Sequence, residues 1–108
     1  MPLYAVTGFD HPPHSMDLRD RLRTEHRNYV QENDQAIRLA GAMYDNDGNQ
    51  CGTLVIFEAR TIDEVWDWFR REPFYKGGVY KDFHIVEWRL ALNALTPTDG
   101  WVKNYPHQ

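Results

Sequence analysis

Hydrophobic and polar positions along the chain alternate with two different periods, which separate predicted strands from predicted helices. Residues 2–9 have apolar side chains on alternating sides, a pattern typical of a strand. From Ser15 to about Asn33, apolar residues recur at helical spacing, and Ser15 is a favourable N-cap. The paired Pro12 and Pro13 stop both the strand and the helix. The chain therefore begins with a strand, a short loop and a helix.

A hairpin is predicted after this helix. Residues 36–44 and 52–59 are apolar runs typical of strands, and turn-forming residues at 45–49 separate them. The Asp47-Gly48 pair tolerates the positive φ that a tight turn needs. We expect two adjacent antiparallel strands here.

A second helix and a last strand complete the pattern. Thr61 and Glu64 form a capping box. Behind it, helical spacing predicts four buried side chains, Ile62, Val65, Trp66 and Phe69. Trp68 lies off this stripe, so we expect it at the surface or at an interface. Pro73 ends the helix, and residues 83–92 form the last strand.

The order β-α-β-β-α-β predicts an α+β fold of the ferredoxin-like, split βαβ type. It has a four-stranded antiparallel sheet with two helices on one face. Residues 1–95 form this domain, and residues 96–108 are a turn-rich tail. Strand 52–59 is apolar on both alternations, so the uncovered sheet face needs a partner. We expect a homodimer packed sheet to sheet, with the tail lying over the partner subunit.

Composition narrows the classes of partner. The chain has 108 residues and a net charge of -4, without a basic run, which argues against nucleic acid as a partner. No apolar stretch is long enough to span a bilayer, so we expect no membrane partner and a cytoplasmic protein. Cys51 is the only cysteine, and we interpret it as a strand residue. No dinucleotide or phosphate motif is present, and His11 and His14 match no metal-ligand spacing, so we expect no cofactor and no metal.

The residue that points most strongly to chemistry is His26, on the predicted buried stripe of the first helix. It lies four residues after Leu22 and four before Val30. An imidazole aimed inward either completes a core hydrogen bond or exchanges protons. The second possibility makes His26 a candidate general base for a small-molecule substrate.

The topology gathers possible partners of His26 at one end of the sheet. Asp10 ends the first strand there, and Glu72 ends the second helix. Asp10 orients the imidazole or forms an Asx turn, and Glu72 is a second acid-base group or a helix-terminal residue. A straight helix from Ser15 carries His26 roughly 15 Å away. We therefore expect a break near Arg23-Thr24.

Cationic and aromatic residues near this cluster are candidate substrate contacts. Arg23 is suited to stabilise an anionic oxygen, whereas Arg19 is interpreted as a solvated flank paired with Asp20 or Glu25. Phe74 and Tyr75 are expected to wall a pocket for the substrate.

Several segments together resemble the YciI-like (YCII-related) family of small dimeric α/β-barrel proteins. They are Leu3–Val6 followed by Asp10, Arg21–His26, Leu39–Gly41, and Glu72–Tyr80, which is close to D-P-[FY]-x-x-A-G-[VL]-[FY]. This chain has Thr24 where the family has proline and Glu72 where it has aspartate. The resemblance implies a ferredoxin-like dimer with an active site centred on a histidine and an aspartate, and a helix break at the proline position.

The function that we predict from these residues is cofactor-independent acid-base chemistry on a small phenolic, hydroxyquinol or carbonyl compound. Elimination and isomerisation belong to this class, and the resembling family includes a dehydrochlorinase of a chlorinated hydroxyhydroquinone. One alternative is a cofactor-free monooxygenase or a muconolactone-isomerase-like enzyme. The other is a non-catalytic ligand-binding or accessory dimer. A cleft beside His26 with room for a ring favours an enzyme.

Overall fold

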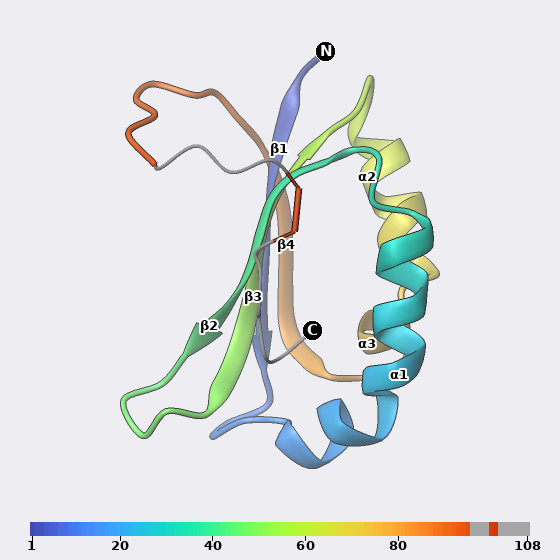
Figure 1. The fold of residues 1–108 in the computed structure, drawn as a ribbon, viewed down its shortest axis with the longest axis vertical. Coiled ribbons are helices and arrows are strands. Elements are labelled where there is room, and N and C mark those ends of the chain that lie inside the picture. The colour runs from blue at the N-terminus through green and yellow to red at the C-terminus, as the bar shows by residue number, and fades with distance from the viewer. Residues whose placement is uncertain (96–99, 102–108) are drawn as a thin grey trace.

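Four strands form one antiparallel sheet, and helices cover one of its faces (Figure 1). The computed structural model describes residues 1–95, 100 and 101. The elements in chain order are β1 (Leu3–Asp10), α1 (Met16–Glu32), β2 (Ile37–Tyr44), β3 (Gln50–Glu58), α2 (Ile62–Arg70), α3 (Pro73–Lys76) and β4 (Tyr80–Trp88). The strand order is β2-β3-β1-β4, which confirms the ferredoxin-like fold. The short helix α3 is an addition that the sequence pattern did not predict.

Strand pairing explains where the last strand begins and ends. We expected residues 83–92, whereas β4 runs from Tyr80 to Trp88. Its partner β1 pairs Asp10 with Tyr80 and Leu3 with Trp88, so beyond Trp88 the ladder has no partner left. The hairpin between β2 and β3 agrees more closely with its prediction, since Gly48 has a φ of 83°.

The core lies between the sheet and the two longer helices. It contains buried side chains of the sheet and of both helices, among them Val6, Val30, Val55, Val65 and Ile85. The two expectations about the flanks of α2 were wrong. Ile62 is 37% exposed in the first turn, and Trp68 is 9% exposed. Trp68 is buried because its ring packs against Tyr29 of α1 and Phe57 of β3, with centroids 4.9 and 5.5 Å away, so this side of α2 meets protein instead of solvent.

The first helix is continuous from Met16 to Glu32, so the expected break near Arg23-Thr24 was wrong. Figure 1 shows that its first turns, in blue, cross the end of the sheet before the later turns, in cyan, run along the sheet face. Because the helix bends without a break, Arg19 and His26, seven residues apart, stay on one side of it.

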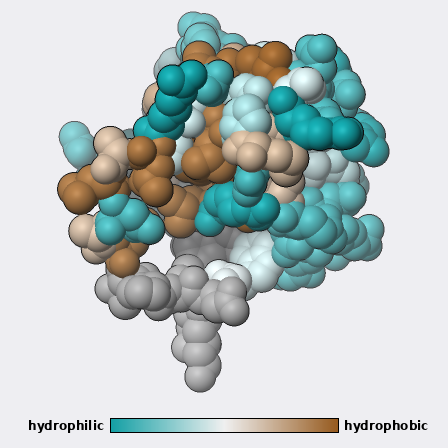
Figure 2. All heavy atoms as spheres, turned by 90° about the horizontal axis from the view of Figure 1, so that it is seen from above, coloured by the Kyte–Doolittle hydropathy of each residue, from teal (hydrophilic) through white to brown (hydrophobic). Residues whose placement is uncertain are grey.

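The sheet face opposite the helices carries exposed apolar side chains on every strand. They are Phe9 on β1, Leu39 on β2, Leu54 on β3 and Val86 on β4, each at least 44% exposed. Figure 2 shows hydrophobic groups gathered on the sheet side of the molecule, at the left, and hydrophilic groups on the helix side. No helix in the described part of the chain is long and apolar enough to cross a membrane.

The predicted tail, residues 96–108, lies mostly outside the described residues. Of it, Gly100 and Trp101 are described, and the Trp101 indole N–H donates to Asp34 Oδ2 of its own chain over 3.0 Å.

Candidate active site

Asp10 and Arg19 form a buried, bidentate ion pair at the end of β1. Arg19 Nε donates to Oδ2 over 2.8 Å, and Nη2 donates to Oδ1 over 2.9 Å. Asp10 Oδ2 also accepts the backbone N–H of Ser15 over 3.0 Å. Burial alone lowers the pKa of Arg19, but interactions with Asp10 and Tyr80 outweigh it and raise the pKa above the usual arginine value. The pair is therefore a fixed ionic link between β1 and α1.

This link corrects two expectations. Asp10 does not contact the His26 imidazole, because Arg19 and the Ser15 N–H occupy its carboxylate. Arg19 is not a solvated flank, because the bent start of α1 turns its guanidinium under the sheet end, where the side chain is 4% exposed.

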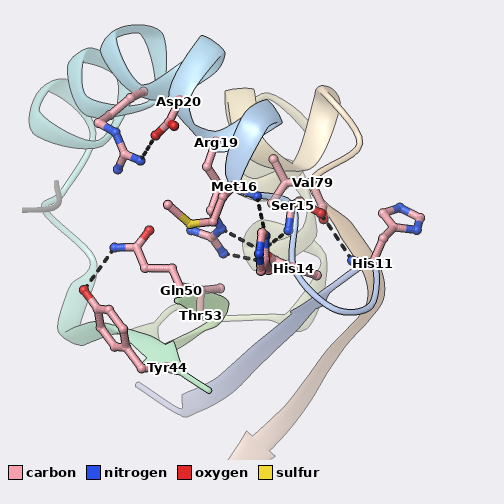
Figure 3. Close-up of polar contacts among 12 residues, drawn as sticks. His11, His14, Ser15, Met16, Arg19, Asp20, Tyr44, Gln50, Thr53 and Val79 are labelled. Atoms are coloured by element: carbon pink, nitrogen blue, oxygen red, sulfur yellow. Dashed lines mark hydrogen bonds and ion pairs between the residues drawn. The ribbon is translucent and has the colours of Figure 1, made fainter. Parts of the chain in front are cut away.

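Ser15 joins the same corner to β4. Its hydroxyl accepts the His11 backbone N–H over 3.3 Å and donates to the Val79 carbonyl over 2.8 Å (Figure 3). Ser15 precedes α1 as predicted, but its side chain makes no capping hydrogen bond. The residue instead fixes the start of α1 against the start of β4.

His26 has a different carboxylate partner, Glu72. The His26 Nδ1 and Glu72 Oε1 atoms are hydrogen-bonded, and the Glu72 side chain is 2% exposed. A carboxylate accepts only, so Nδ1 carries the proton in this contact and Nε2 is the basic nitrogen of the neutral ring. The His26 ring stacks on Phe74, with centroids 3.8 Å apart and planes 7° from parallel. The imidazole thus has a fixed tautomer and a fixed plane.

Glu72 is held by the helix that follows it. Its Oε1 accepts the Phe74 N–H over 3.1 Å, and its Oε2 accepts the Tyr75 N–H over 3.0 Å. Glu72 is therefore the N-cap of α3, and Pro73 occupies the first turn, where a missing N–H costs nothing. We expected Pro73 to end a helix; α2 does end before it, but Pro73 also begins α3. Because α3 packs against α1, the carboxylate reaches His26 without a helix break.

A cavity of about 560 Å³ opens beside these residues, large enough for a small aromatic ring. Its polar lining includes His26, Glu72, Arg19, Thr53 and Tyr80. The His26 side chain is 19% exposed, so the ring is neither sealed in the core nor free in solvent. Of the three predicted catalytic residues, the cavity brings together His26 and Glu72, and Asp10 lies behind Arg19.

The predicted substrate contacts divide in the same way. Phe74 lines the cavity under His26. Arg23 is not among the lining residues, and its Nη2 donates to Asp20 Oδ1 over 2.7 Å at the surface. Tyr75 faces Trp66 and Phe83 instead, with centroids 6.3 and 4.8 Å away. The structure thus places Arg23 and Tyr75 outside the cavity.

Among the lining residues, Arg19 was expected to be a solvated flank and Tyr80 was given no role. Arg19 lies seven residues before His26, which is the same helix side, and this spacing was a usable signal. Tyr80 is the last residue of the Glu72–Tyr80 segment, but nothing local indicates that its ring turns back to the cavity. The Arg19 Cζ atom lies 5.1 Å from the Phe74 ring centroid and 5.7 Å from that of Tyr80.

The sequence profile of the YCII-related domain matches residues 3–89. The chain belongs to the YCII-related family. Glu72 occupies the acidic position expected from the resemblance and contacts His26, so the histidine and the acidic residue of this family member form one pair.

Among solved structures, this YCII-related chain is similar to 5-chloro-2-hydroxyhydroquinone dehydrochlorinase (TftG) from Burkholderia phenoliruptrix, in complex with 2,5-dihydroxybenzoquinone. The identity is 23%, the TM-score is 0.73, and the match covers 82% of this chain and 95% of that one. It is also similar to an antibiotic biosynthesis monooxygenase, at 15% identity and a TM-score of 0.53, over 85% of this chain and 100% of that one. No curated protein sequence matches the chain. At these identities the two structures show the shared fold.

Proposed function

We propose that this protein is a cofactor-independent enzyme that moves protons on a small phenolic, hydroxyquinol or carbonyl compound. The observation that carries the proposal is the His26–Glu72 pair at the edge of a ring-sized cavity. Membership of the YCII-related family and the fold shared with a dehydrochlorinase support elimination of hydrogen chloride as the reaction to test first.

In this mechanism His26 Nε2 takes a proton from a substrate hydroxyl group. Glu72 holds the Nδ1 proton and stabilises the imidazolium that forms. The electron pair left on the substrate oxygen forms a C=O bond while the adjacent chlorine-bearing ring carbon takes up the proton from His26, which gives a keto tautomer. His26 Nε2 then takes the proton of the hydroxyl group para to this C=O, and the electron pair left there moves through the neighbouring C=C bond and expels chloride with its bonding pair. The proton on His26 and the departing anion together make up the eliminated acid, so the step needs no external oxidant or reductant.

The test is chloride release from 5-chloro-2-hydroxyhydroquinone under anaerobic conditions. We expect His26→Asn, which keeps a donor for Glu72 but lacks Nε2, to lower kcat by about 100-fold or more. The matched control is His11→Ala, because the His11 side chain is exposed and lies outside the cavity lining. Equal chloride release by His26→Asn and the wild type contradicts the mechanism, and release no faster than in buffer contradicts dehydrochlorination.

The same assay in air distinguishes the second enzyme class. The fold shared with an antibiotic biosynthesis monooxygenase makes oxygen uptake the relevant measurement. A cofactor-free monooxygenase consumes oxygen in proportion to substrate, whereas an elimination consumes none before its product reacts further.

We also propose that two copies of the chain pack through their sheets. The exposed Phe9, Leu39, Leu54 and Val86 side chains share the face opposite the helices and support this arrangement. We expect a dimer in sedimentation at micromolar concentration, and a monomer for Leu54→Lys together with Val86→Lys. A wild-type monomer under these conditions contradicts the proposal.

A further inference from the structure

Tyr80 is a tyrosine in the cavity lining that the proton-transfer proposal does not use. It is the first residue of β4 and pairs with Asp10, the last residue of β1. Its ring lies in the cavity lining together with Arg19 and Thr53.

Gly8 on β1 has no side chain, and this leaves space for the Tyr80 ring. A Cβ atom on Gly8 would lie 2.8 Å from Tyr80 Cδ1 and 2.9 Å from Phe83 Cδ1, closer than real contacts allow. Gly8 pairs with Phe83 on one side and with Thr53 on the other. The Tyr80 ring therefore lies over Gly8, and its hydroxyl interacts with Thr53 on β3, at the cavity.

Burial and a negatively charged neighbour keep the Tyr80 hydroxyl protonated, so that it remains a hydrogen-bond donor. Burial first, and then the negative charge of Glu72, raise the pKa of Tyr80 well above the usual tyrosine value, although Arg19 and Thr53 act in the opposite direction. The Tyr80 phenol is therefore neutral at physiological pH. A neutral phenol donates one proton to an oxygen and is strongest where that oxygen gains negative charge.

The cavity lining also contains an acceptor without a donor. Gln50 is 2% exposed, and its Oε1 atom is buried without a hydrogen-bond partner among the described residues. Figure 3 shows its amide nitrogen directed to the Tyr44 hydroxyl, 3.2 Å away, and its oxygen turned elsewhere. A buried carbonyl oxygen left unpaired costs about 1–3 kcal/mol, which favours a ligand that supplies a donor.

We propose that Tyr80 binds a hydroxyl group of the substrate, so that the cavity selects small hydroxylated rings. The ring hydroxyl accepts the Tyr80 proton, and its own proton is free for an acceptor such as Gln50. The inference deepens the proposed function, because it assigns the residue that binds substrate oxygen while His26 exchanges the proton. It replaces Arg23, which lies outside the cavity, as the predicted oxygen-binding residue.

The test is a binding measurement, so it does not depend on turnover. Hydroquinone and p-xylene have nearly the same shape, but only hydroquinone has hydroxyl groups. We expect Tyr80→Phe to weaken hydroquinone binding about tenfold, the effect of one lost hydrogen bond, and to leave p-xylene binding unchanged. The matched control is Tyr4→Phe, which removes a hydroxyl from a buried tyrosine outside the cavity lining and should change neither affinity.

A second measurement uses the wild-type protein and so does not depend on the variant folding. With 13C at tyrosine Cζ, the Tyr80 signal should shift on addition of hydroquinone and not of p-xylene. Equal weakening of both ligands in Tyr80→Phe, no weakening of either, or no hydroquinone binding by the wild type at millimolar concentration would overturn the proposal. Loss of turnover in His26→Asn with hydroquinone binding retained separates this inference from the proposed mechanism.

Discussion

Two carboxylates bind side chains of α1 that lie two helical turns apart, and they leave different atoms of these side chains free. Asp10 engages Arg19 through both carboxylate oxygens, and the two side chains are almost completely buried. Glu72 engages one nitrogen of His26, and the imidazole remains partly exposed at the cavity. Arg19 of the first pair lines the cavity but keeps its protons, whereas the second pair leaves the basic Nε2 of His26 available. Proton exchange here depends on which partner atom remains free, because both carboxylates are buried.

The largest expected effect comes from breaking the closed pair. Asp10→Asn leaves the Arg19 cation buried without a counter-charge, and we expect a loss of about 3–5 kcal/mol in the free energy of unfolding. Urea denaturation of the variant and the wild type measures this. A loss below about 1 kcal/mol would mean that water reaches Arg19 and that the two pairs differ less than their burial indicates.

The open pair should respond differently. Glu72→Gln keeps an oxygen that can cap α3 but removes the charge that fixes the His26 tautomer, so we expect a loss of about 1–2 kcal/mol in stability. The 15N shifts of the His26 ring should show proton density moving from Nδ1 towards Nε2. Glu72→Asp is the matched variant, because it keeps the charge and a favourable cap. If Glu72→Gln leaves the ring shifts unchanged, Glu72 does not set the tautomer.

An alkaline titration tests whether the Tyr80 hydroxyl stays protonated in the folded protein. Because the pKa of Tyr80 is raised in the folded protein, folding protects its proton, and the resulting stability is lost as pH rises from the usual tyrosine pKa through the folded one. In an absorbance titration we expect the latest tyrosinate phase of the wild type to be missing in Tyr80→Phe, and the raised pKa of Tyr29 to leave an earlier delayed phase in both. A complete titration at the usual tyrosine value in the folded wild type would contradict this prediction.

The smallest expected effect is at the surface pair Arg23–Asp20, on the same helix. The Asp20 side chain is 64% exposed, so Arg23→Ala should change the free energy of unfolding by less than about 1 kcal/mol. It should also leave hydroquinone binding unchanged, since Arg23 lies outside the cavity lining. A weakening as large as that expected for Tyr80→Phe would return Arg23 to the substrate site.

The sequence was sufficient for the fold because its elements follow from local periodicity and turn chemistry. Half of the predicted capping box is present: the Thr61 hydroxyl accepts the Glu64 N–H, whereas the Glu64 carboxylate accepts the Arg60 N–H and not that of Thr61. His26 and Glu72 were identified for the same reason, because His26 lies on the apolar stripe of its helix and Glu72 was expected at the end of the second helix. Local sequence patterns do not determine how a helix bends or how it is oriented on the sheet.

The pairing of the acidic residues depended on that direction. The bend of α1 turns Arg19 towards Asp10, and α3 carries Glu72 to His26. Neither the bend nor a four-residue helix leaves a periodic signal. The burial of Trp68 was not predicted for a related reason, because the position of α1 beside α2 is a tertiary property.

The indole of Trp68 links the helix pair to the cavity. Its Nε1–H donates to the Asn33 carbonyl over 2.7 Å. The backbone carbonyl of Trp68 accepts the Tyr29 hydroxyl over 2.6 Å. The residue also lines the cavity. A molecule that enters the cavity therefore changes the environment of an indole whose N–H is hydrogen-bonded to the Asn33 carbonyl. Intrinsic fluorescence should report occupancy directly, which allows ligands to be screened in solution before any reaction is known.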